Sequence, residues 1–186
     1  DTFHTSFMLG KLIIQTTKII SVFIILATYA CKPEIVGYSN VPEIGLIDVN
    51  VIENVLAKDS VIQLIISYRD GDGDIGLTDS DTVAPYNLGS PYAHNLPITF
   101  MVEDANGEFT ELVNITNGRL YGNNHSRVPV ITPTGKYKAI SGKITINLTA
   151  NPAAQSPASV YLEIQLIDRA LNTSNKIRTE VINLTH

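Results

Sequence analysis

Residues that several kinds of site require are scarce in this chain. Its 186 residues contain no tryptophan and a single cysteine, Cys31. One cysteine excludes an intramolecular disulfide framework and any metal site built from several thiolates. The lack of tryptophan weakens the expectation of a platform on which sugar rings stack. A Gly-x-Ser-x-Gly nucleophile elbow and a phosphate-cradling Gly-x-x-x-x-Gly-Lys loop are also absent from the sequence.

Positive charge is scarce too. The formal net charge is −5, from 13 Lys or Arg residues and 18 Asp or Glu residues. Two of the basic residues but only one of the acidic residues lie before Cys31, so the rest of the chain is acidic. An acidic domain without a basic stripe is poorly suited to the phosphate backbone of DNA or RNA. We therefore expect no nucleic-acid partner.

The first thirty residues have the organisation of a secretory signal. A largely apolar run from Ile19 to Ala30 follows two lysines and ends in small residues. The run has about a dozen residues, whereas a helix that crosses a bilayer needs roughly 20, so a membrane span is the weaker alternative. We expect residues 1–30 to form a cleaved signal-peptide helix, with Met8 as the initiator and residues 1–7 upstream of it.

The signal ends in a segment that resembles a lipobox, in which a small residue precedes a cysteine that receives diacylglycerol. In Leu26-Ala27-Thr28-Tyr29-Ala30-Cys31 the alanine before the cysteine fits this pattern, whereas Thr28 and Tyr29 depart from it. The resemblance implies that Cys31 is lipidated and anchors the chain to a membrane. The alternative is a buried free thiol. Residues 31–43 contain turn residues without a sustained period and are predicted to be a lipid-anchored tether.

Residues 44–186 are predicted to form one all-β domain. Beyond the tether no segment has a convincing helical period, and short runs of alternating apolar residues are separated by Gly, Pro, Asn and Asp. Asn106-Gly107 between two apolar runs is a strong signal for a β-hairpin. The pattern favours a seven-stranded immunoglobulin-like β-sandwich, with a small barrel as the alternative. The expected strands are residues 46–51, 61–68, 98–102, 109–113, 143–149, 160–167 and 177–184.

Two segments resemble families of bacterial envelope proteins. Residues 166–175, with Asp168, Asn172 and Ser174, look like the last hairpin of bacterial immunoglobulin-like and fibronectin-III-like domains. Residues 68–76 are similar to a segment of uncharacterised lipoproteins of the Bacteroidota. These resemblances imply a lipoprotein of the bacterial outer membrane, facing either the periplasm or the surface. They imply no activity.

One constellation carries chemistry, namely three aspartates that alternate with glycines directly after the strongest predicted strand. Asp70, Asp72 and Asp74 repel one another, and glycine lets the backbone fold tightly enough for their carboxylates to converge. Ca²⁺ relieves such repulsion, because it binds six to eight oxygens in flexible geometry. The spacing matches the first half of an EF-hand loop, but the second half lacks the turn glycine and the final glutamate. We therefore predict a calcium site that is not an EF-hand.

Further carboxylates are expected near this loop if the sandwich is correct. The loop after the second strand then shares an end with the loop after the sixth, so Asp168 is a candidate fourth ligand and Asp79 or Asp81 a fifth. Two alternatives remain open. The aspartates could serve only the geometry of a solvated turn. Two of them could instead form an acidic catalytic pair, as in glycosidases.

Two triplets resemble a signal for covalent modification. Asp59-Ser60-Val61 and Asp81-Thr82-Val83 are similar to the Asp-Ser/Thr-aliphatic pattern of protein O-glycosylation in the Bacteroidota. The resemblance implies Ser60 and Thr82 as residues to which a glycan is attached.

The sequence as a whole predicts an envelope-anchored, non-enzymatic module with a binding or structural role. Its expected partners are the membrane, through the lipid anchor, and an envelope protein or a glycan. A glycan-active enzyme, or a substrate-binding accessory of one, that uses the acidic loop is one alternative. An interaction subunit of an outer-membrane complex is another, and such a subunit would expose an apolar patch.

Overall fold

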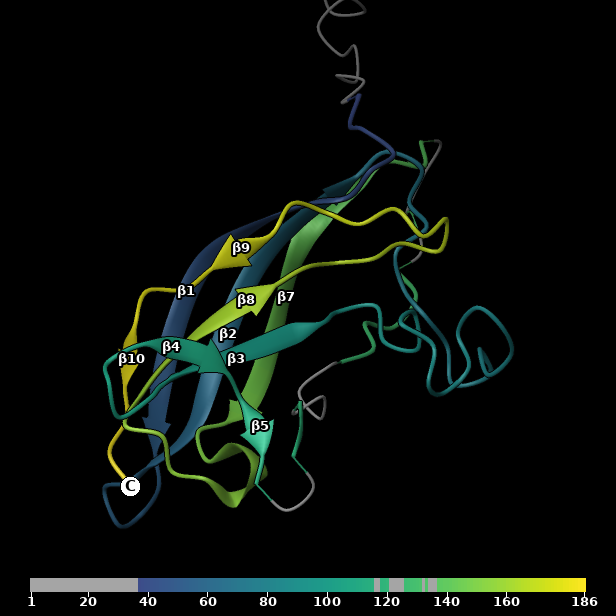
Figure 1. Cartoon of the computed structure of the whole chain (residues 1–186). Coiled ribbons are helices and arrows are strands. Elements are labelled where there is room, and N and C mark those ends of the chain that lie inside the picture. The colour runs from purple at the N-terminus through teal and green to yellow at the C-terminus, as the bar shows by residue number, and fades with distance from the viewer. Residues whose placement is uncertain (1–36, 116–117, 121–125, 132, 134–136) are drawn as a thin grey trace, which may run out of the picture. The chain divides into compact units, whose positions relative to one another are not determined.

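The computed structural model (Figure 1) describes residues 37–115, 118–120, 126–131, 133 and 137–186. Residues Gly37–His186 form one compact unit. The predicted signal-peptide helix, Cys31 and the first part of the predicted tether lie outside the described residues. Within the described residues, no helix has the length and apolar character that crossing a membrane requires.

The described part of the chain is all-β, with two antiparallel sheets and one small hairpin (Figure 1). The first sheet has the order β1 (Glu43–Glu53), β2 (Asp59–Asp70), β7 (Ile140–Thr149). The second has the order β10 (Ile182–Asn183), β8 (Ser159–Ile164), β3 (Ile98–Glu103), β4 (Phe109–Glu111), and β9 (Ile177–Arg178) also pairs with β8. The small hairpin joins β5 (Val113–Asn114) to β6 (Arg119–Leu120). One 3₁₀ turn, Pro152–Ala154, precedes β8.

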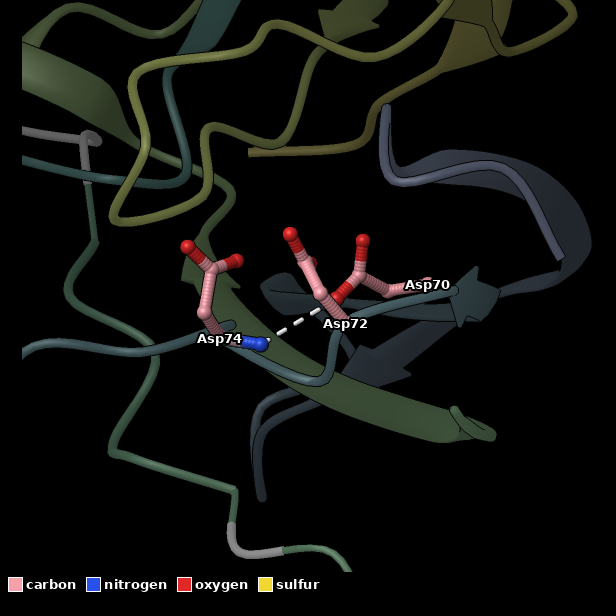
Figure 2. Close-up of side chains that lie close together, drawn as sticks. All are labelled: Asp70, Asp72 and Asp74. Atoms are coloured by element: carbon pink, nitrogen blue, oxygen red, sulfur yellow. Dashed lines mark hydrogen bonds between the residues drawn. The ribbon is translucent and has the colours of Figure 1, made fainter. Parts of the chain in front are cut away.

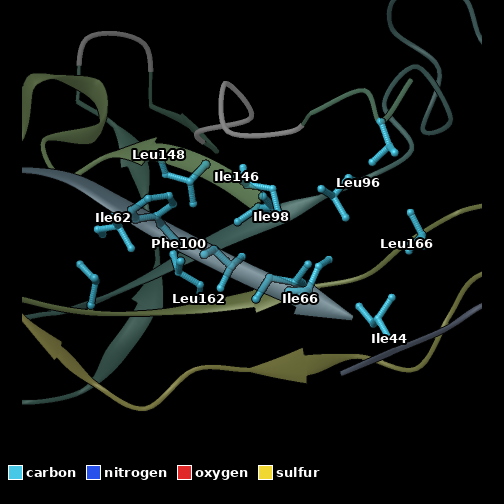
Figure 3. Packing of buried hydrophobic residues seen from close by; sticks show 14 of the residues in the cluster. Ile44, Ile62, Ile66, Leu96, Ile98, Phe100, Ile146, Leu148, Leu162 and Leu166 are labelled. Carbon is cyan, nitrogen blue, oxygen red and sulfur yellow. The ribbon is translucent and has the colours of Figure 1, made fainter. Parts of the chain in front are cut away.

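The two sheets enclose one apolar core, as the pattern of β2 explains. Every second residue from Ile62 to Ile66 is fully buried, whereas Arg69 on the outer face is exposed. Strands β3 and β8 contribute to the same cluster from the other sheet, and Figure 3 shows Phe100 and Leu162 beside the side chains of β2. This sandwich-like arrangement confirms the predicted all-β class.

The predicted number of strands is wrong, because ten strands are present in the described residues and not seven. The predicted strand 177–184 is two short strands, β9 and β10, and the predicted strand 109–113 is divided between β4 and β5. Apolar alternation does not reveal where a strand loses its backbone partner, so it predicts one strand in each of these two places. It also misses the two-residue strand β6, which is too short to show alternation. The two predicted hairpins are confirmed, because β3 pairs with β4 and β8 pairs with β9, each antiparallel.

Thr179 bridges the gap between β9 and β10. It is 3% exposed, its N–H donates to Leu162 O at 3.0 Å, and its Oγ1 accepts from Leu162 N at 3.0 Å. The hydroxyl thus supplies the acceptor that the interrupted strand no longer offers. Strands β9 and β10 therefore act as one interrupted edge strand beside β8.

Thr179→Val is expected to destabilise the domain by about 1–3 kcal/mol, because it leaves the Leu162 N–H buried and unpaired at nearly unchanged side-chain volume. Urea unfolding followed by circular dichroism measures the change. Thr145→Val is the matched control, because Thr145 is exposed on β7 and its replacement should change the stability by less than about 0.5 kcal/mol. Equal effects of the two substitutions would show that the Thr179 hydroxyl carries no specific bond.

β1 is an edge strand whose outer side is closed at two points. Asn175 Oδ1 accepts from Ile44 N at 3.0 Å, and Asn175 Nδ2 donates to Ile44 O at 2.9 Å. Further along, the register shifts between Leu46 and Asp48, and Asp48 Oδ1 accepts from Val49 N at 2.9 Å. A register shift and side-chain caps of this kind hinder pairing with a strand of another chain.

Candidate metal centre

Asp70 lies at the end of β2, where the inward-facing alternation would place another apolar side chain. It pairs with Ile140 of β7 and is 0% exposed. Its Oδ2 accepts hydrogen bonds from the backbone N–H groups of Gly73 at 2.8 Å and Asp74 at 3.2 Å. Its Oδ1 is buried and has no hydrogen-bond partner. A buried carboxylate with an unsatisfied oxygen is costly unless a ligand completes it.

Asp72 and Asp74 present their carboxylates beside that of Asp70. Figure 2 shows all three directed to the same side of the loop, and one oxygen of each lies within 4.8 Å of the others. In Asp72 and Asp74, as in Asp70, Oδ1 is buried without a partner. The ion pairs among the described residues involve none of the three. The loop therefore concentrates negative charge and free lone pairs, and no described cation forms an ion pair with it.

Gly71 and Gly73 let this loop lie between two neighbouring segments. A Cβ atom at Gly71 would collide with the backbone carbonyl of Tyr38 and with Asn40 Oδ1, and one at Gly73 would collide with Lys138 O. Gly73 also has a φ of +69°, a conformation that L side chains rarely adopt. Packing against these neighbouring segments therefore requires glycine at both positions between the aspartates. This requirement is separate from the convergence of the carboxylates.

Burial and mutual repulsion disfavour the charged form of this group. Burial raises the pKa of Asp70 to about 6; the N–H groups of Gly73 and Asp74 oppose the shift, and the charges of Asp72 and Asp74 add to it. The pKa of Asp74 is raised as well, first by burial and then by the charges of Asp168 and Asp72. At neutral pH the loop without a cation is therefore electrostatically unfavourable.

The metal-free domain is expected to lose stability as the pH rises through about 6, the pKa of Asp70 in the folded chain. That pKa exceeds the unfolded value of about 3.9, so the stabilisation is fully present below the unfolded pKa and is lost above the folded one. His94 and Asp81 act oppositely: burial lowers the pKa of His94, so its contribution is lost as the pH falls below about 6.5, whereas that of Asp81, whose pKa Arg169 lowers, is lost only at lower pH. The contribution of Asp70 is therefore isolated by comparison with Asp70→Asn, in a chelator. Between pH 5 and pH 7.5 the thermal midpoint of the unaltered domain should fall relative to that of Asp70→Asn. The same change of midpoint in both proteins would contradict the prediction.

Asp168 organises the turn that contacts the aspartate loop. Its Oδ1 accepts from Asn172 N at 2.7 Å, and its Oδ2 accepts from Asn172 Nδ2 at 2.8 Å. Within this turn the N–H of Ala170 donates to Asp74 Oδ2 at 3.0 Å, and the N–H of Arg169 donates to Asp74 O at 3.2 Å. The two loops therefore meet, as the sandwich interpretation predicted. The group of carboxylates that could share a metal ion does not include Asp168 among the described residues.

Asp81 and Asp79 also lie outside that group. Asp81 Oδ2 accepts from Arg169 Nη1 at 2.9 Å and from Thr78 N at 2.7 Å, and Asp81 Oδ1 accepts from Arg169 Nη2 at 3.1 Å. The bonds from Arg169 and Thr78 hold the pKa of Asp81 well below its usual range. Asp79 is exposed. Asp81 is thus the ion-pair partner of Arg169, and no sequence signal marked this pair because its members are 88 positions apart.

Two of the three candidate modification sites lie within the described residues. Cys31 lies outside the described residues. Ser60 in β2 and Thr82 in the connection from β2 to β3 are both exposed. Solvent therefore reaches both residues for which the resemblance implies an attached glycan.

Two surface cavities lie apart from the three aspartates. One, of about 430 Å³, lies over β1, β2 and β7, and its lining includes Tyr38, Glu43, Arg69 and Lys143. The other, of about 330 Å³, is lined by polar residues around Lys58 and the C-terminal residue. The candidate metal centre is therefore a loop site and does not line either cavity.

Comparison of the chain with models of protein families, with curated proteins and with solved structures found no match. The chemistry of the aspartate loop and the arrangement of the strands are therefore the observations from which a function is argued.

Proposed function

We propose that this protein is an envelope-anchored lipoprotein whose β-sandwich domain binds Ca²⁺ at Asp70, Asp72 and Asp74 and serves as a non-enzymatic binding or structural module. The observation that carries the proposal is the fully buried Asp70, whose carboxylate lies together with those of Asp72 and Asp74 and whose Oδ1, like theirs, has no hydrogen-bond partner. A divalent cation there would replace the repulsion of three carboxylates by attraction.

Calcium fits this loop better than magnesium or zinc does. All three side chains offer hard oxygen ligands, and no histidine or cysteine belongs to the group. Zinc sites in proteins usually include nitrogen or sulfur ligands. Magnesium requires nearly ideal octahedral geometry, whereas calcium tolerates the irregular arrangement of a loop. Three carboxylates supply part of the six to eight oxygens that calcium takes, and backbone carbonyls and water would supply the rest.

We also propose that the fold is a fibronectin-III-like member of the immunoglobulin-like sandwiches. When β9 and β10 are counted as one interrupted strand, the two sheets hold three and four strands, in the orders β1-β2-β7 and β4-β3-β8-β9/β10. The chain crosses between the sheets after β2, after β4 and before β8. Crossings of this kind are typical of Greek-key sandwiches, whose end loops carry binding sites.

The lipid anchor is tested at the N-terminus of the mature protein. The proposal expects mass spectrometry of protein purified from the envelope to find a chain that begins at Cys31 and carries acyl groups. An unprocessed N-terminus upstream of Cys31, recovered from the cytosol, would contradict it. This measurement is independent of calcium, so the anchor and the metal centre can fail separately.

Calcium is expected to raise the thermal midpoint of the domain. A ligand that binds the folded state at about 100 times its dissociation constant adds about 2.7 kcal/mol of stability. For a domain of this size that corresponds to about 5–10 °C. Thermal unfolding with calcium and then with a chelator measures the effect, and magnesium at the same concentration serves as the control ion. An unchanged midpoint would remove the metal from the proposal.

An interaction subunit of an outer-membrane complex is the second candidate function. The observation that favours it is the turn between β1 and β2, where Val55 is 101% exposed and Leu56 is 76% exposed. Two adjacent aliphatic side chains at a tip offer an apolar surface that a protein partner would cover. The double substitution Val55→Ser and Leu56→Ser should then abolish co-purification of an envelope protein with the intact lipoprotein. Retained co-purification would exclude the tip as the contact.

A further inference from the structure

We propose that metal binding at the aspartate loop fixes the segment Tyr38–Asn40, through which the chain enters the domain, against that loop. This inference rests on the proposed calcium site. The fully buried Asp70, with an unpartnered oxygen directed into that site, is the observation that distinguishes the loop from a solvated acidic turn.

The entry segment is held by the same loop that would hold the metal. The N–H of Gly71, between Asp70 and Asp72, donates to Ser39 O at 2.8 Å. The α-hydrogen face of Gly71 lies against Tyr38 O and Asn40 Oδ1, so closely that no Cβ atom would fit there. Any movement of the loop therefore moves the surface on which the entry segment rests.

The turn after β8 contacts the entry segment from a second direction. Asn172 Nδ2 donates to Asn40 O at 3.4 Å and also to Asp168 Oδ2 at 2.8 Å. The same turn donates from Ala170 N to Asp74 Oδ2 at 3.0 Å. The entry segment, the aspartate loop and this turn are thus joined by hydrogen bonds around one end of the sandwich.

Repulsion within the loop acts on all three elements. Without a cation, the carboxylates of Asp70, Asp72 and Asp74 repel one another. Gly71, which donates to Ser39 O, stands between two of these aspartates in the sequence. With a cation the carboxylates are drawn together, and the N–H of Gly71 stays aimed at Ser39. By linkage, the factor by which calcium favours the docked segment equals the factor by which the docked segment favours calcium.

Hydrogen exchange of the full chain, with calcium and with a chelator, tests this coupling. We expect exchange of the Gly71 N–H, which makes the bond to the entry segment, to slow about tenfold in calcium, within the range that such couplings span. The turn Asn54–Lys58, at the other end of β2, makes no contact with the aspartate loop through its backbone bonds and should exchange at the same rate in both conditions. Calorimetric titration with calcium shows separately whether the ion binds. Binding without slower exchange at Gly71 would overturn the inference and leave the metal site intact, whereas no binding would overturn both.

Two alanine substitutions provide a matched pair. Gly71→Ala introduces a Cβ that displaces the entry segment, whereas Gly37→Ala introduces one with nothing within 4 Å. We expect calcium affinity to fall about tenfold in Gly71→Ala and to stay unchanged in Gly37→Ala. Equal affinities in a folded Gly71→Ala variant, whose Cβ cannot coexist with the docked segment, would overturn the coupling. If Gly71→Ala does not fold, the exchange measurement on the unaltered chain decides alone.

Discussion

Asp70→Asn is expected to make the metal-free domain more stable at neutral pH and to abolish its stabilisation by calcium. The amide oxygen can still accept from Gly73 N and Asp74 N, which bond to Asp70 Oδ2 at 2.8 and 3.2 Å. The substitution removes one of three neighbouring charges, together with the cost of ionising a fully buried carboxylate. The same change removes the most buried carboxylate of the proposed site, so affinity for Ca²⁺ should be lost.

Thermal unfolding in a chelator and in calcium separates these two effects. The unaltered domain should gain about 5–10 °C at about 100 times the dissociation constant, whereas Asp70→Asn should start from a higher midpoint and gain less than about 1 °C. Asp104→Asn is the matched control, because Asp104 also accepts from two backbone N–H groups in a turn but is exposed. It should leave the calcium response unchanged. A full calcium response in Asp70→Asn would exclude Asp70 as a ligand, and a lower metal-free midpoint would refute the charge argument.

The parts of this molecule that the sequence predicts are those in which local chemistry decides the outcome. Alternation from Ile62 to Ile66 predicts β2, and Asn106-Gly107 predicts the turn between β3 and β4. The aspartate loop is predictable for the same reason, because glycines between the aspartates let the backbone turn tightly enough for neighbouring carboxylates to converge. The burial of Asp70 also follows from the register, since it occupies an inward position of β2.

The parts that the sequence does not predict depend on partners far apart in the chain. The last strand divides where Thr179 Oγ1 replaces a carbonyl opposite Leu162, and no spacing along the chain marks that exchange. Asp81 follows Asp74 closely in the sequence and is for that reason an expected calcium ligand. In the structure it is instead the ion-pair partner of Arg169. The partner of a charged side chain in a loop depends on which groups lie near it in the folded chain. The sequence therefore does not distinguish candidate ligands outside the Asp-Gly repeat from residues that form ion pairs.

The long connection between β2 and β3 is held by a residue to which no sequence pattern pointed. Arg127 donates from its guanidinium to four backbone carbonyls of this connection and makes no ion pair among the described residues. Its acceptors are Ala93 O at 2.7 Å, Tyr86 O at 2.9 Å, Thr78 O at 3.1 Å and Asp81 O at 3.1 Å. A planar fork of five donors suits this task, whereas the compact ammonium group of lysine would reach fewer of these acceptors at once.

Arg127→Ala is therefore expected to destabilise the domain by about 3 kcal/mol or more, because several partly buried carbonyls lose a charged donor together. Arg127→Lys should recover less than half of the loss. Arg69→Ala is the control, because its exposed ion pair with Glu43 should contribute less than about 1 kcal/mol. Urea unfolding of the three variants measures these differences, and equal losses in Arg127→Ala and Arg69→Ala would contradict the assignment.

The calcium response of Arg127→Ala adds a second, independent test. Asp74 is held by Ala170 N and Arg169 N, and Asp70 by the backbone of its own loop, so none of the bonds that shape the aspartate loop passes through Arg127. The variant should thus unfold at a lower temperature but gain as much from calcium as the unaltered domain does. A smaller gain would mean that the connection after Asp74 must be anchored before the carboxylates can converge. The metal would then stabilise the whole end of the sandwich and not one loop.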